Sequence, residues 1–449
     1  MQYLAQIQAG QHAPQTLEAL FRAAERAQGS AEFREDIAAA YAAAPENQLL
    51  EAWQLRLADV ATASTVANAS SESTVAADRS RVHWGLVLPF SVITSVVLWL
   101  LSDPLFVFRD AAGHTELYLQ LLVTPVIAVT AIGFLTGARR AHLSATPHSV
   151  ALLGGVTVLT ALAFWRSVGN VDYRHVASGH MPLLAWAAVG ICLMGIRASA
   201  RDRFAFLTKS TEVVVVTGVY GLAVMAFNGI TVQLFKTLGI TLSESVIRLL
   251  MVGGAGLMPI VAVATVYDPL VSPSAQDFRR GLSKMVTTLP RLLLVPTLVV
   301  LAVYVALIPA HFMQPFYDRT SLLTYNGMLF AVAALLIGAT PVHADDLSAD
   351  YQRWLRRGIV AIAAFAVLVA AYALAAVLYR TAHDRLTLNR LTVIGWNVIH
   401  IGVLSGLLYR QVTGARDAWI ASLHATFSEA SVAFAAWAAC VVVVLPWVV

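Results

Sequence analysis

Long apolar runs recur through most of this chain, and they restrict its possible folds more than any other feature. Beyond residue 82 the sequence holds eleven such runs, separated by short polar stretches. They lie at residues 83–101, 118–137, 148–165, 180–198, 211–235, 245–267, 286–309, 321–341, 358–379, 391–409 and 431–449. A helix of about 20 residues crosses the roughly 30 Å of a bilayer's hydrocarbon core. The sequence therefore predicts an all-α, polytopic helical membrane protein with about 11 transmembrane helices in residues 82–449.

The composition agrees with a membrane protein and argues against other classes. The 449 residues are 58% hydrophobic and 12% charged, whereas soluble domains are about 45–50% apolar and about 25% charged. The net charge of +4 is typical of basic loops facing anionic lipid, so we expect membrane lipids as partners and no nucleic acid. Cys192 and Cys440 lie inside apolar runs, which favours packing over a disulfide. The first 80 residues lack an apolar stretch preceded by basic residues, so we expect no cleavable signal peptide.

Residues 1–60 lack long apolar runs and show the spacing of amphipathic helices instead. Helices are predicted after Pro14, Ser30 and Pro45, because residues that suit a helix start precede each apolar pattern. The expected apolar faces are Leu17, Leu20, Phe21 and Ala24; Phe33, Ile37 and Tyr41; and Leu49, Leu50, Trp53 and Leu57. Residues 1–60 are therefore predicted to form a small soluble three-helix unit. Residues 61–81 are rich in small residues, serine and threonine, which is typical of a flexible linker.

Lysine and arginine are distributed unequally between alternate loops. With the N-terminus in the cytoplasm, the cytoplasmic loops hold 14 of them and the opposite loops hold 8. Because cytoplasmic loops are enriched in basic residues, we expect a multi-pass protein of the bacterial inner membrane whose N-terminus and helical unit are cytoplasmic. The loop at residues 380–390 opposes this rule, since it is basic yet falls on the outer side. Before the last run, Trp419, Ile420, Leu423 and Phe427 share one helical face, which predicts a helix lying at the membrane surface.

Four stretches of the apolar region together resemble one family. They are NGITVQLFKTLGI (228–240), MVGGAGLMPIVAVATVYDP (251–269), LPRLLLVPTLVVLAVYV (289–305) and RLTLNRLTVIGWNV (385–398). On these motifs the chain resembles the domain of unknown function 4153 family, a group of bacterial multi-span membrane proteins, over about residues 83–410. The resemblance implies a multi-span fold and carries no particular activity, cofactor or site residue to this chain.

Ionisable and polar residues within the apolar runs are functional candidates, because a charge at the centre of a bilayer costs about 2.5–3.5 kcal/mol. Glu244 and Arg248 are four residues apart near the start of the sixth run, which predicts an ion pair or an arginine that faces an anion. Asn397 and His400 share a face of the tenth run, where interhelical hydrogen bonds are the favoured interpretation. His400 could relay protons, but no intramembrane carboxylate accompanies it, which argues against a proton-coupled pump.

The stretch RTAHDRLTLNR, residues 380–390, holds the densest charge between two runs. Arginine offers planar, bidentate donors that suit phosphate. Our first hypothesis is therefore non-enzymatic transport or handling of an anionic lipid or lipid-linked substrate. Its site would lie between the sixth, seventh and tenth runs, near their outer ends. The candidate residues are Arg248, Glu244, Arg385, Arg390, Asn389, Asn397 and His400.

Two other functions are compatible with the sequence. Residues 1–60 could recruit a cytoplasmic protein partner to a membrane scaffold or sensor, or His383, Asp384 and Arg385 could serve a membrane-embedded transferase. The sequence contains no GxxxxGK[ST], GxSxG or HExxH motif, and PVHADD (341–346) lacks the spacing of metal ligands, so we predict no catalytic residue, cofactor or metal site. The glycines of MVGGAGLMP and GFLTG are expected to allow close helix packing, in preference to an unwound ligand-binding segment.

Overall fold

The computed structural model describes residues 3–26, 30–54, 56–57, 82–103, 116–139, 146–167, 170–278, 282–317, 319–343, 347–415 and 418–447. The chain folds into two compact units, Met1–Arg81 and Val82–Val449. The predicted linker at residues 61–81 lies outside the described residues.

The N-terminal unit contains the three predicted helices and one more. They are α2 (Pro14–Arg26), α3 (Ser30–Ala43) and helical residues 48–54 and 56–57, preceded by the short α1 (Leu4–Ala9) that sequence reasoning missed. Phe21, Phe33 and Trp53 stack edge to face or tilted at the centre of its core, with ring centroids 5.5–6.2 Å apart. The backbone N–H of Tyr3 donates to Asp36 Oδ2 over 2.8 Å, which ties the residue before α1 to α3.

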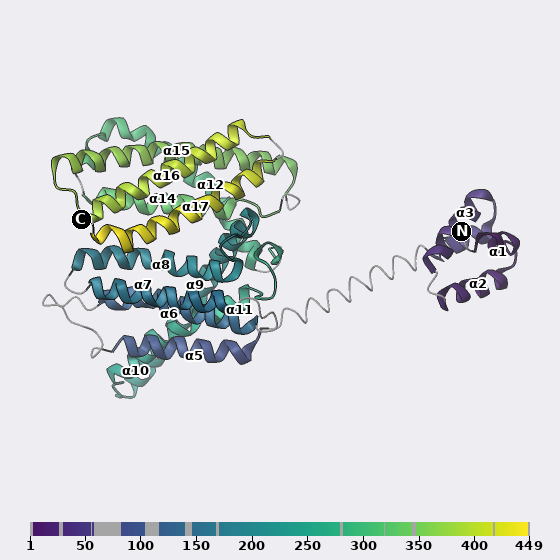
Figure 1. Ribbon diagram of the computed structural model, residues 1–449, viewed down its shortest axis with the longest axis horizontal. Helices are drawn as coiled ribbons and strands as arrows, with labels where there is room; N and C mark the ends of the chain where they lie inside the picture. The colour runs from purple at the N-terminus through teal and green to yellow at the C-terminus, as the bar shows by residue number, and fades with distance from the viewer. Residues whose placement is uncertain are drawn as a thin grey trace. The chain divides into compact units, whose positions relative to one another are not determined.

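The second unit is a bundle of long helices (Figure 1). They are α5 (Trp84–Leu101), α6 (Glu116–Ala138), α7 (Thr146–Ser167), α8 (Val171–Met194), α9 (Ala200–Thr237), α10 (Glu244–Arg248), α11 (Gly254–Val266), α12 (Leu282–Leu307), α13 (Gln314–Tyr317), α14 (Arg319–Ala339), α15 (Ala349–His383), α16 (Leu388–Thr413) and α17 (Trp419–Ala439). A π-helical turn, Leu249–Gly253, joins α10 to α11, and another, Cys440–Val444, follows α17. Each predicted apolar run overlaps one of these helices, and no strand occurs among the described residues.

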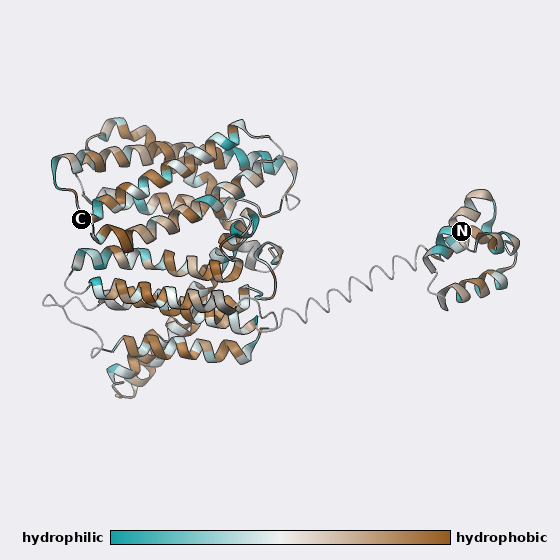
Figure 2. Cartoon of the chain, viewed as in Figure 1, coloured by the Kyte–Doolittle hydropathy of each residue, from teal (hydrophilic) through white to brown (hydrophobic). Residues whose placement is uncertain are grey.

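The bundle is that of a multi-pass membrane protein. Within the described residues, nine helices are long and apolar enough to cross a bilayer. The other two predicted spans are represented by the shorter apolar stretches Ala151–Ser167 and Thr324–Ala339. The all-α polytopic fold is therefore confirmed, while the count of eleven spans stays a prediction. Figure 2 shows brown, hydrophobic residues along the helices of the bundle, with teal residues gathered mainly toward their ends and the loops.

Successive long segments of the bundle run in alternating directions, with α10 and α11 forming one such segment, so the loops and helix ends lie at two opposite ends of the bundle (Figure 1). We call the end where α5 begins, at Trp84, the proximal end, and the end near Asp103 the distal end. Arg139, at the end of α6, donates to the carbonyls of Leu193 and Pro269 at the proximal end. The distal end contains the contact of Trp99 Nε1 with the carbonyl of Ser245. The α15–α16 turn lies at the distal end (Figure 1).

The largest apolar core of the bundle joins α12, α14, α15, α16, α17 and the first turns of α9. Small residues line the buried face of α15, where Ala363, Ala366 and Ala370 are fully buried. Such residues let neighbouring helix backbones approach closely in a membrane. A second core joins α5, α6 and α11.

The predicted helix at the membrane surface is wrong. Trp419, Ile420, Leu423 and Phe427 lie within α17 itself, and all four are buried in the largest core. Phe427 packs against Phe204 of α9, with ring centroids 6.2 Å apart. A one-sided apolar face is equally suited to a membrane surface and to a neighbouring helix, and here the neighbouring helix covers it.

The predicted role of the glycines is confirmed. A Cβ atom added at Gly256 would lie 3.0 Å from Ser95 Cα in α5, and one added at Gly254 would lie 3.0 Å from Asn228 Nδ2 in α9. At Gly133 it would lie 2.7 Å from the Phe90 ring. These glycines therefore allow α5, α6, α9 and α11 to pack closely. Asn228 donates across this contact to the carbonyl of Leu250, in the π-helical turn.

Candidate functional site

The α15–α16 turn is built by residues that cap both helices. Asp384 is the C-cap of α15, and its backbone N–H donates to the carbonyl of Arg380. Thr387 is the N-cap of α16, and its hydroxyl accepts the backbone N–H of Arg390 over 3.3 Å. Threonine is a preferred N-cap because its side chain satisfies one of the N–H groups left free at a helix start. Part of the LTLNR motif is therefore explained by local helix capping.

Arg390 closes this turn from the first turn of α16. Its Nη2 lies 2.6 Å from Asp384 Oδ2, and its Nη1 donates to the carbonyls of Arg385 (2.8 Å) and Arg380 (3.3 Å). The Arg380 carbonyl already accepts the backbone N–H of Asp384, so Arg390 adds a second hydrogen bond there and also supplies a donor to the carbonyl of Arg385. The Arg390 side chain is 21% exposed. Arg390 therefore helps to hold together the helical hairpin formed by α15 and α16.

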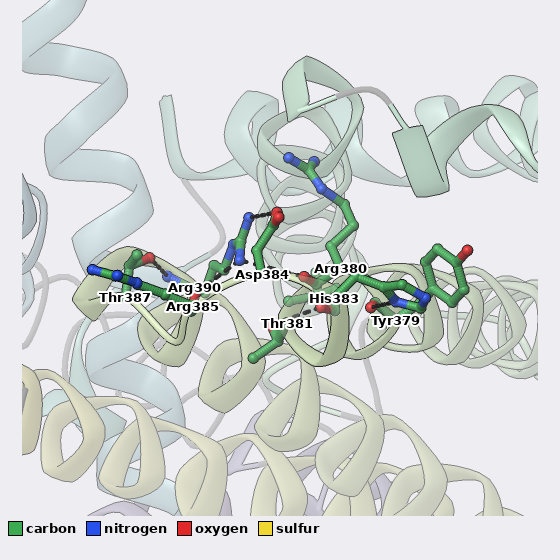
Figure 3. Close-up of polar contacts among 9 residues, drawn as sticks. Tyr379, Arg380, Thr381, His383, Asp384, Arg385, Thr387 and Arg390 are labelled. Carbon is green, nitrogen blue, oxygen red and sulfur yellow. Dashed lines mark hydrogen bonds and ion pairs between the residues drawn. The ribbon is translucent and has the colours of Figure 1, made fainter.

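Two other arginines of the turn face elsewhere. In Figure 3 the side chains of Arg380 and Arg385 extend away from the Asp384–Arg390 ion pair. Arg380 Nη1 is buried and has no hydrogen-bond acceptor. Arg385 and Asn389 are exposed. Arg390 is paired with Asp384, the one carboxylate among residues 380–390. The charges of Arg380 and Arg385 are therefore not compensated within the turn, which has a surplus of positive charge.

The residues of the suggested transferase group do not face one another. His383 Nδ1 donates to the carbonyl of Tyr379, and the two rings lie 4.2 Å apart between centroids. Asp384 instead pairs with Arg390. The geometry needed for a histidine and a carboxylate to act together on a substrate is therefore not formed by this turn.

The predicted pair between Glu244 and Arg248 is wrong. Arg248 Nη2 lies 2.6 Å from Asp103 Oδ2, and Arg248 Nη1 lies 3.4 Å from Ser102 Oγ. Glu244 is exposed. The π-helical turn after α10 packs against α5, which brings the end of α5 to Arg248. An acceptor 145 residues away therefore replaces the one expected four residues away.

The candidate arginines are divided between two places at the distal end. Figure 1 shows α10 at the bottom of the bundle and α15 at its top. Correspondingly, α11 packs on α5, α6 and α9, whereas α16 packs on α8, α14, α15 and α17. The single site predicted between the sixth, seventh and tenth segments is therefore not assembled. Arg248 belongs to one place, and Arg385, Asn389 and Arg390 belong to the other.

Asn397 and His400 lie deeper in α16, with Asn397 roughly 15 Å along the helix axis from Thr387. Both are buried, and Asn397 Nδ2 donates to Asn326 Oδ1 of α14 over 3.2 Å, so its predicted interhelical hydrogen bond is confirmed. His400 Nδ1 donates to the carbonyl of Trp396 in its own helix. Trp396 Nε1 donates to His180 Nε2 of α8 over 2.8 Å. This aromatic and amide cluster holds α8, α14 and α16 together and is separate from the turn.

A buried ion pair was missed by sequence reasoning. Lys209 Nζ lies 2.8 Å from Glu212 Oε2 on α9, and the two side chains are only 4% and 8% exposed. Lys209 Nζ also lies 5.0 Å from the centroid of the Phe278 ring. The sequence carried a signal, since a lysine three residues before a glutamate begins an apolar run. Lys209 was instead assigned to the preceding loop, and Glu212 contradicts the expectation that the spans hold no carboxylate.

No metal-ligand cluster of three or more His, Cys, Asp or Glu side chains occurs among the described residues. Comparisons of the chain with protein-family models, with curated proteins and with solved structures find no match. The resemblance to the domain of unknown function 4153 family therefore stays a prediction. The functional interpretation rests on the geometry of the molecule itself.

Proposed function

We propose that this multi-pass membrane protein binds and handles an anionic lipid or lipid-linked phosphate at the α15–α16 turn, in a non-enzymatic transport role. The observation that supports this proposal is the surplus of guanidinium groups there. Arg380 keeps a buried Nη1 without an acceptor, and Arg385 is exposed, while Asp384 is already paired with Arg390. A phosphate group would supply acceptors to both free guanidinium groups.

The position of the turn suits a lipid headgroup. It joins two helices that are long and apolar enough to span a bilayer, so it falls where a span meets the polar surface of the membrane. The first turn of α16 adds backbone N–H groups with no acceptor within the helix, and such helix starts favour anions. The exposed side chain of Asn389 lies in this first turn. Headgroup phosphate, and no deeper part of a lipid, is therefore the expected ligand.

Retention of lipid by the purified full-length protein tests this proposal. Native mass spectrometry would compare phosphatidylglycerol with phosphatidylcholine of the same acyl chains. We expect preferential retention of phosphatidylglycerol, which Arg380→Ala with Arg385→Ala abolishes. The matched control removes two arginines from the other end of α15, with Arg353→Ala and Arg357→Ala. Equal retention of phosphatidylglycerol by both double variants would contradict the proposal, and competition by inorganic phosphate would separate a free phosphate ligand from a lipid.

The proposed orientation places the N-terminus in the cytoplasm of a bacterium and the α15–α16 turn on the outer side of the inner membrane. The excess of basic residues in the loops of the proximal end supports it. Arg385→Cys, labelled in intact cells with a thiol reagent that does not cross the membrane, tests it. Strong labelling is expected, and labelling only after cell lysis would place the turn in the cytoplasm.

A second function is supported by the N-terminal unit. The described residues between Tyr3 and Leu57 have their own apolar core, and Met1–Arg81 form a compact unit distinct from the bundle. Such a unit is suited to recruiting a cytoplasmic protein partner to the membrane. A photo-crosslinking residue at the exposed position Glu51 is expected to capture that partner in cells. A chain that forms no adduct from this or other exposed positions of the unit would argue against recruitment.

A further inference from the structure

A cavity of about 280 Å³ lies among α6, α8, α9 and α11. In this ring α6 packs on α8 and α11, and α9 packs on the same two helices, so α6 and α9 face each other across the cavity. Small-molecule sites in proteins measure about 300–1,000 Å³. This cavity lies just below that range, so it is suited to one short acyl chain and is too small for a two-chain lipid.

The wall of the cavity is mostly apolar, and two of its polar groups satisfy each other. Trp186 Nε1 donates to Ser210 Oγ over 2.9 Å, and Ser210 Oγ donates to the carbonyl of Phe206 over 2.7 Å. Most of the remaining lining residues are alanine, valine, leucine and isoleucine side chains. A ligand in this cavity would therefore be held mainly by apolar contact.

The charge of the wall favours a neutral ligand. Lys209 is the one charged residue among the described residues that line the cavity, and Glu212 pairs with it at 2.8 Å. An anion placed beside this pair would leave a buried negative charge without a partner, and a cation would leave a positive one. In a buried environment, such an uncompensated charge costs on the order of several kcal/mol of free energy. A neutral ligand avoids this cost.

Two hydroxyl groups on the wall can bind oxygen atoms of such a ligand. Thr124 Oγ1, on α6, is buried and has no hydrogen-bond partner. Tyr267, just beyond the end of α11, is 4% exposed, and its hydroxyl is buried without a hydrogen-bond partner. Thr124 lies fourteen residues before the end of α6, whereas Tyr267 packs in one apolar core with Leu135, near that end of α6. The two hydroxyls are thus spread along the cavity, which suits an elongated molecule.

We infer that this cavity binds a neutral, single-chain lipid that carries a hydroxyl or carbonyl oxygen. Its chain would lie against the apolar walls of α6, α8 and α9, and its oxygen would meet the free hydroxyl of Thr124 or that of Tyr267. This site is distinct from the α15–α16 turn, which uses other helices and a different ligand charge.

Photolabelling of the full-length protein in lipid nanodiscs tests the inference. The probe is 1-dodecanol with a diazirine in its chain, compared with the dodecanoate and dodecylammonium analogues of the same chain. Mass spectrometry would map the labelled residues. We expect labelling of cavity residues such as Ala128 and Val213 that saturates with excess 1-dodecanol and is at least fivefold weaker with either charged probe.

Variants of the wall complete the test. Thr124→Val keeps the shape of the side chain and removes one hydrogen bond, so it is expected to weaken saturable labelling about fivefold. Thr160→Val on α7 is the matched control, because Thr160 donates to Val156 of its own helix and does not line the cavity. Ala128→Phe is expected to abolish cavity labelling by filling the space; Thr124→Val decides the question if Ala128→Phe folds poorly.

Three results would overturn the inference: labelling of the cavity that does not saturate, stronger labelling by dodecanoate than by dodecanol, or a Thr124→Val protein that labels like the wild type. The Arg380→Ala and Arg385→Ala double variant should leave this labelling unchanged. A failure of the anionic site at the turn and a failure of the cavity site can therefore be told apart.

Discussion

Arg390 and Asp384 form an ion pair across the α15–α16 turn, with 2.6 Å between Nη2 and Oδ2, while the same guanidinium donates to the carbonyls of Arg380 and Arg385. Asp384 is 62% exposed. Exposed ion pairs contribute little, whereas hydrogen bonds from a charged donor to backbone carbonyls contribute more. The carbonyl contacts, more than the ion pair, are therefore what Arg390 adds to the hairpin.

This difference predicts unequal effects of two substitutions. Arg390→Ala should lower the free energy of unfolding by about 1–3 kcal/mol, because it removes the charged donor to the carbonyls of Arg385 and Arg380. Asp384→Asn should change it by less than about 0.5 kcal/mol. Thermal unfolding in detergent, followed with a thiol-reactive dye on Cys192 and Cys440, measures both; Arg385→Ala is the control. Equal losses from Arg390→Ala and Asp384→Asn would show that the ion pair dominates.

The ion pair between Arg248 and Asp103 predicts coupling between α5 and α10. Its side chains are 15% and 30% exposed, so it is partly shielded from water. In a double-mutant cycle, Arg248→Gln and Asp103→Asn should show a coupling energy of about 1 kcal/mol. Glu244→Gln should leave stability unchanged, because Glu244 is exposed. Coupling of Arg248 to Glu244 in place of Asp103 would restore the pairing expected from the sequence.

The helices of the bundle could be predicted from the sequence because apolar runs of about 20 residues have few structures open to them in a membrane. Helix ends were less predictable. α9 extends from Ala200 to Thr237, well before the run expected from residue 211, because its first turns bury Phe204, Lys209 and Glu212 against other helices. A charged residue that faces lipid would mark the end of a membrane span. The same residue can lie inside a helix of the bundle where other helices surround it.

The partners of polar residues could be predicted only in part. Spacing within one helix suggested that Glu244 would pair with Arg248, yet the acceptor is Asp103, just beyond the end of α5. For the same reason, Trp396 could not be paired with His180 from the sequence, because 216 residues separate them. Patterns within one segment predict that the segment is a helix and which of its faces is apolar, whereas contacts between helices depend on how the bundle is assembled. The cavity among α6, α8, α9 and α11 is likewise a property of the assembly.

The N-terminal unit offers a pH-dependent contact. Side-chain hydrogen bonds from Arg56 and then Arg22 lower the pKa of Glu18 below its ordinary value. A carboxyl whose pKa is lowered on folding stabilises the fold above its unfolded pKa, and the contribution is lost as pH falls through the folded pKa. In residues 1–81, Arg56→Ala should therefore raise the Glu18 pKa more than Arg22→Ala does. Carbon-detected NMR titration of the Glu18 carboxyl measures it, and an unchanged pKa in Arg56→Ala would refute the contact.

The buried pair on α9 predicts that one substitution is worse than two. Lys209→Met removes the ammonium group that lies 2.8 Å from the buried Glu212 carboxylate, which should cost about 3–5 kcal/mol of unfolding free energy or lower the yield of folded protein. Adding Glu212→Leu should recover most of that loss, because an apolar pair of similar size needs no charge compensation. The dye-based unfolding assay compares the single and double variants. A double variant as unstable as Lys209→Met would mean that the carboxylate has a further essential partner.

Gly395 on α16 predicts a strict requirement for glycine. A Cβ atom at this position would overlap the indole ring of Trp437, on α17. The ring is bulky and cannot shift without disturbing its neighbours, so Gly395→Ala should lower the free energy of unfolding by about 1–3 kcal/mol. Gly402, two turns further along the same helix, has nothing within 4 Å of its would-be Cβ. Gly402→Ala should therefore leave stability unchanged or raise it by up to about 1 kcal/mol, because alanine favours helix more than glycine does.

Comparing the two variants by thermal unfolding separates the packing effect from helix propensity, since the substitution and the helix are the same. Equal behaviour of the two would show that α16 and α17 are not packed as closely as the Gly395–Trp437 contact requires.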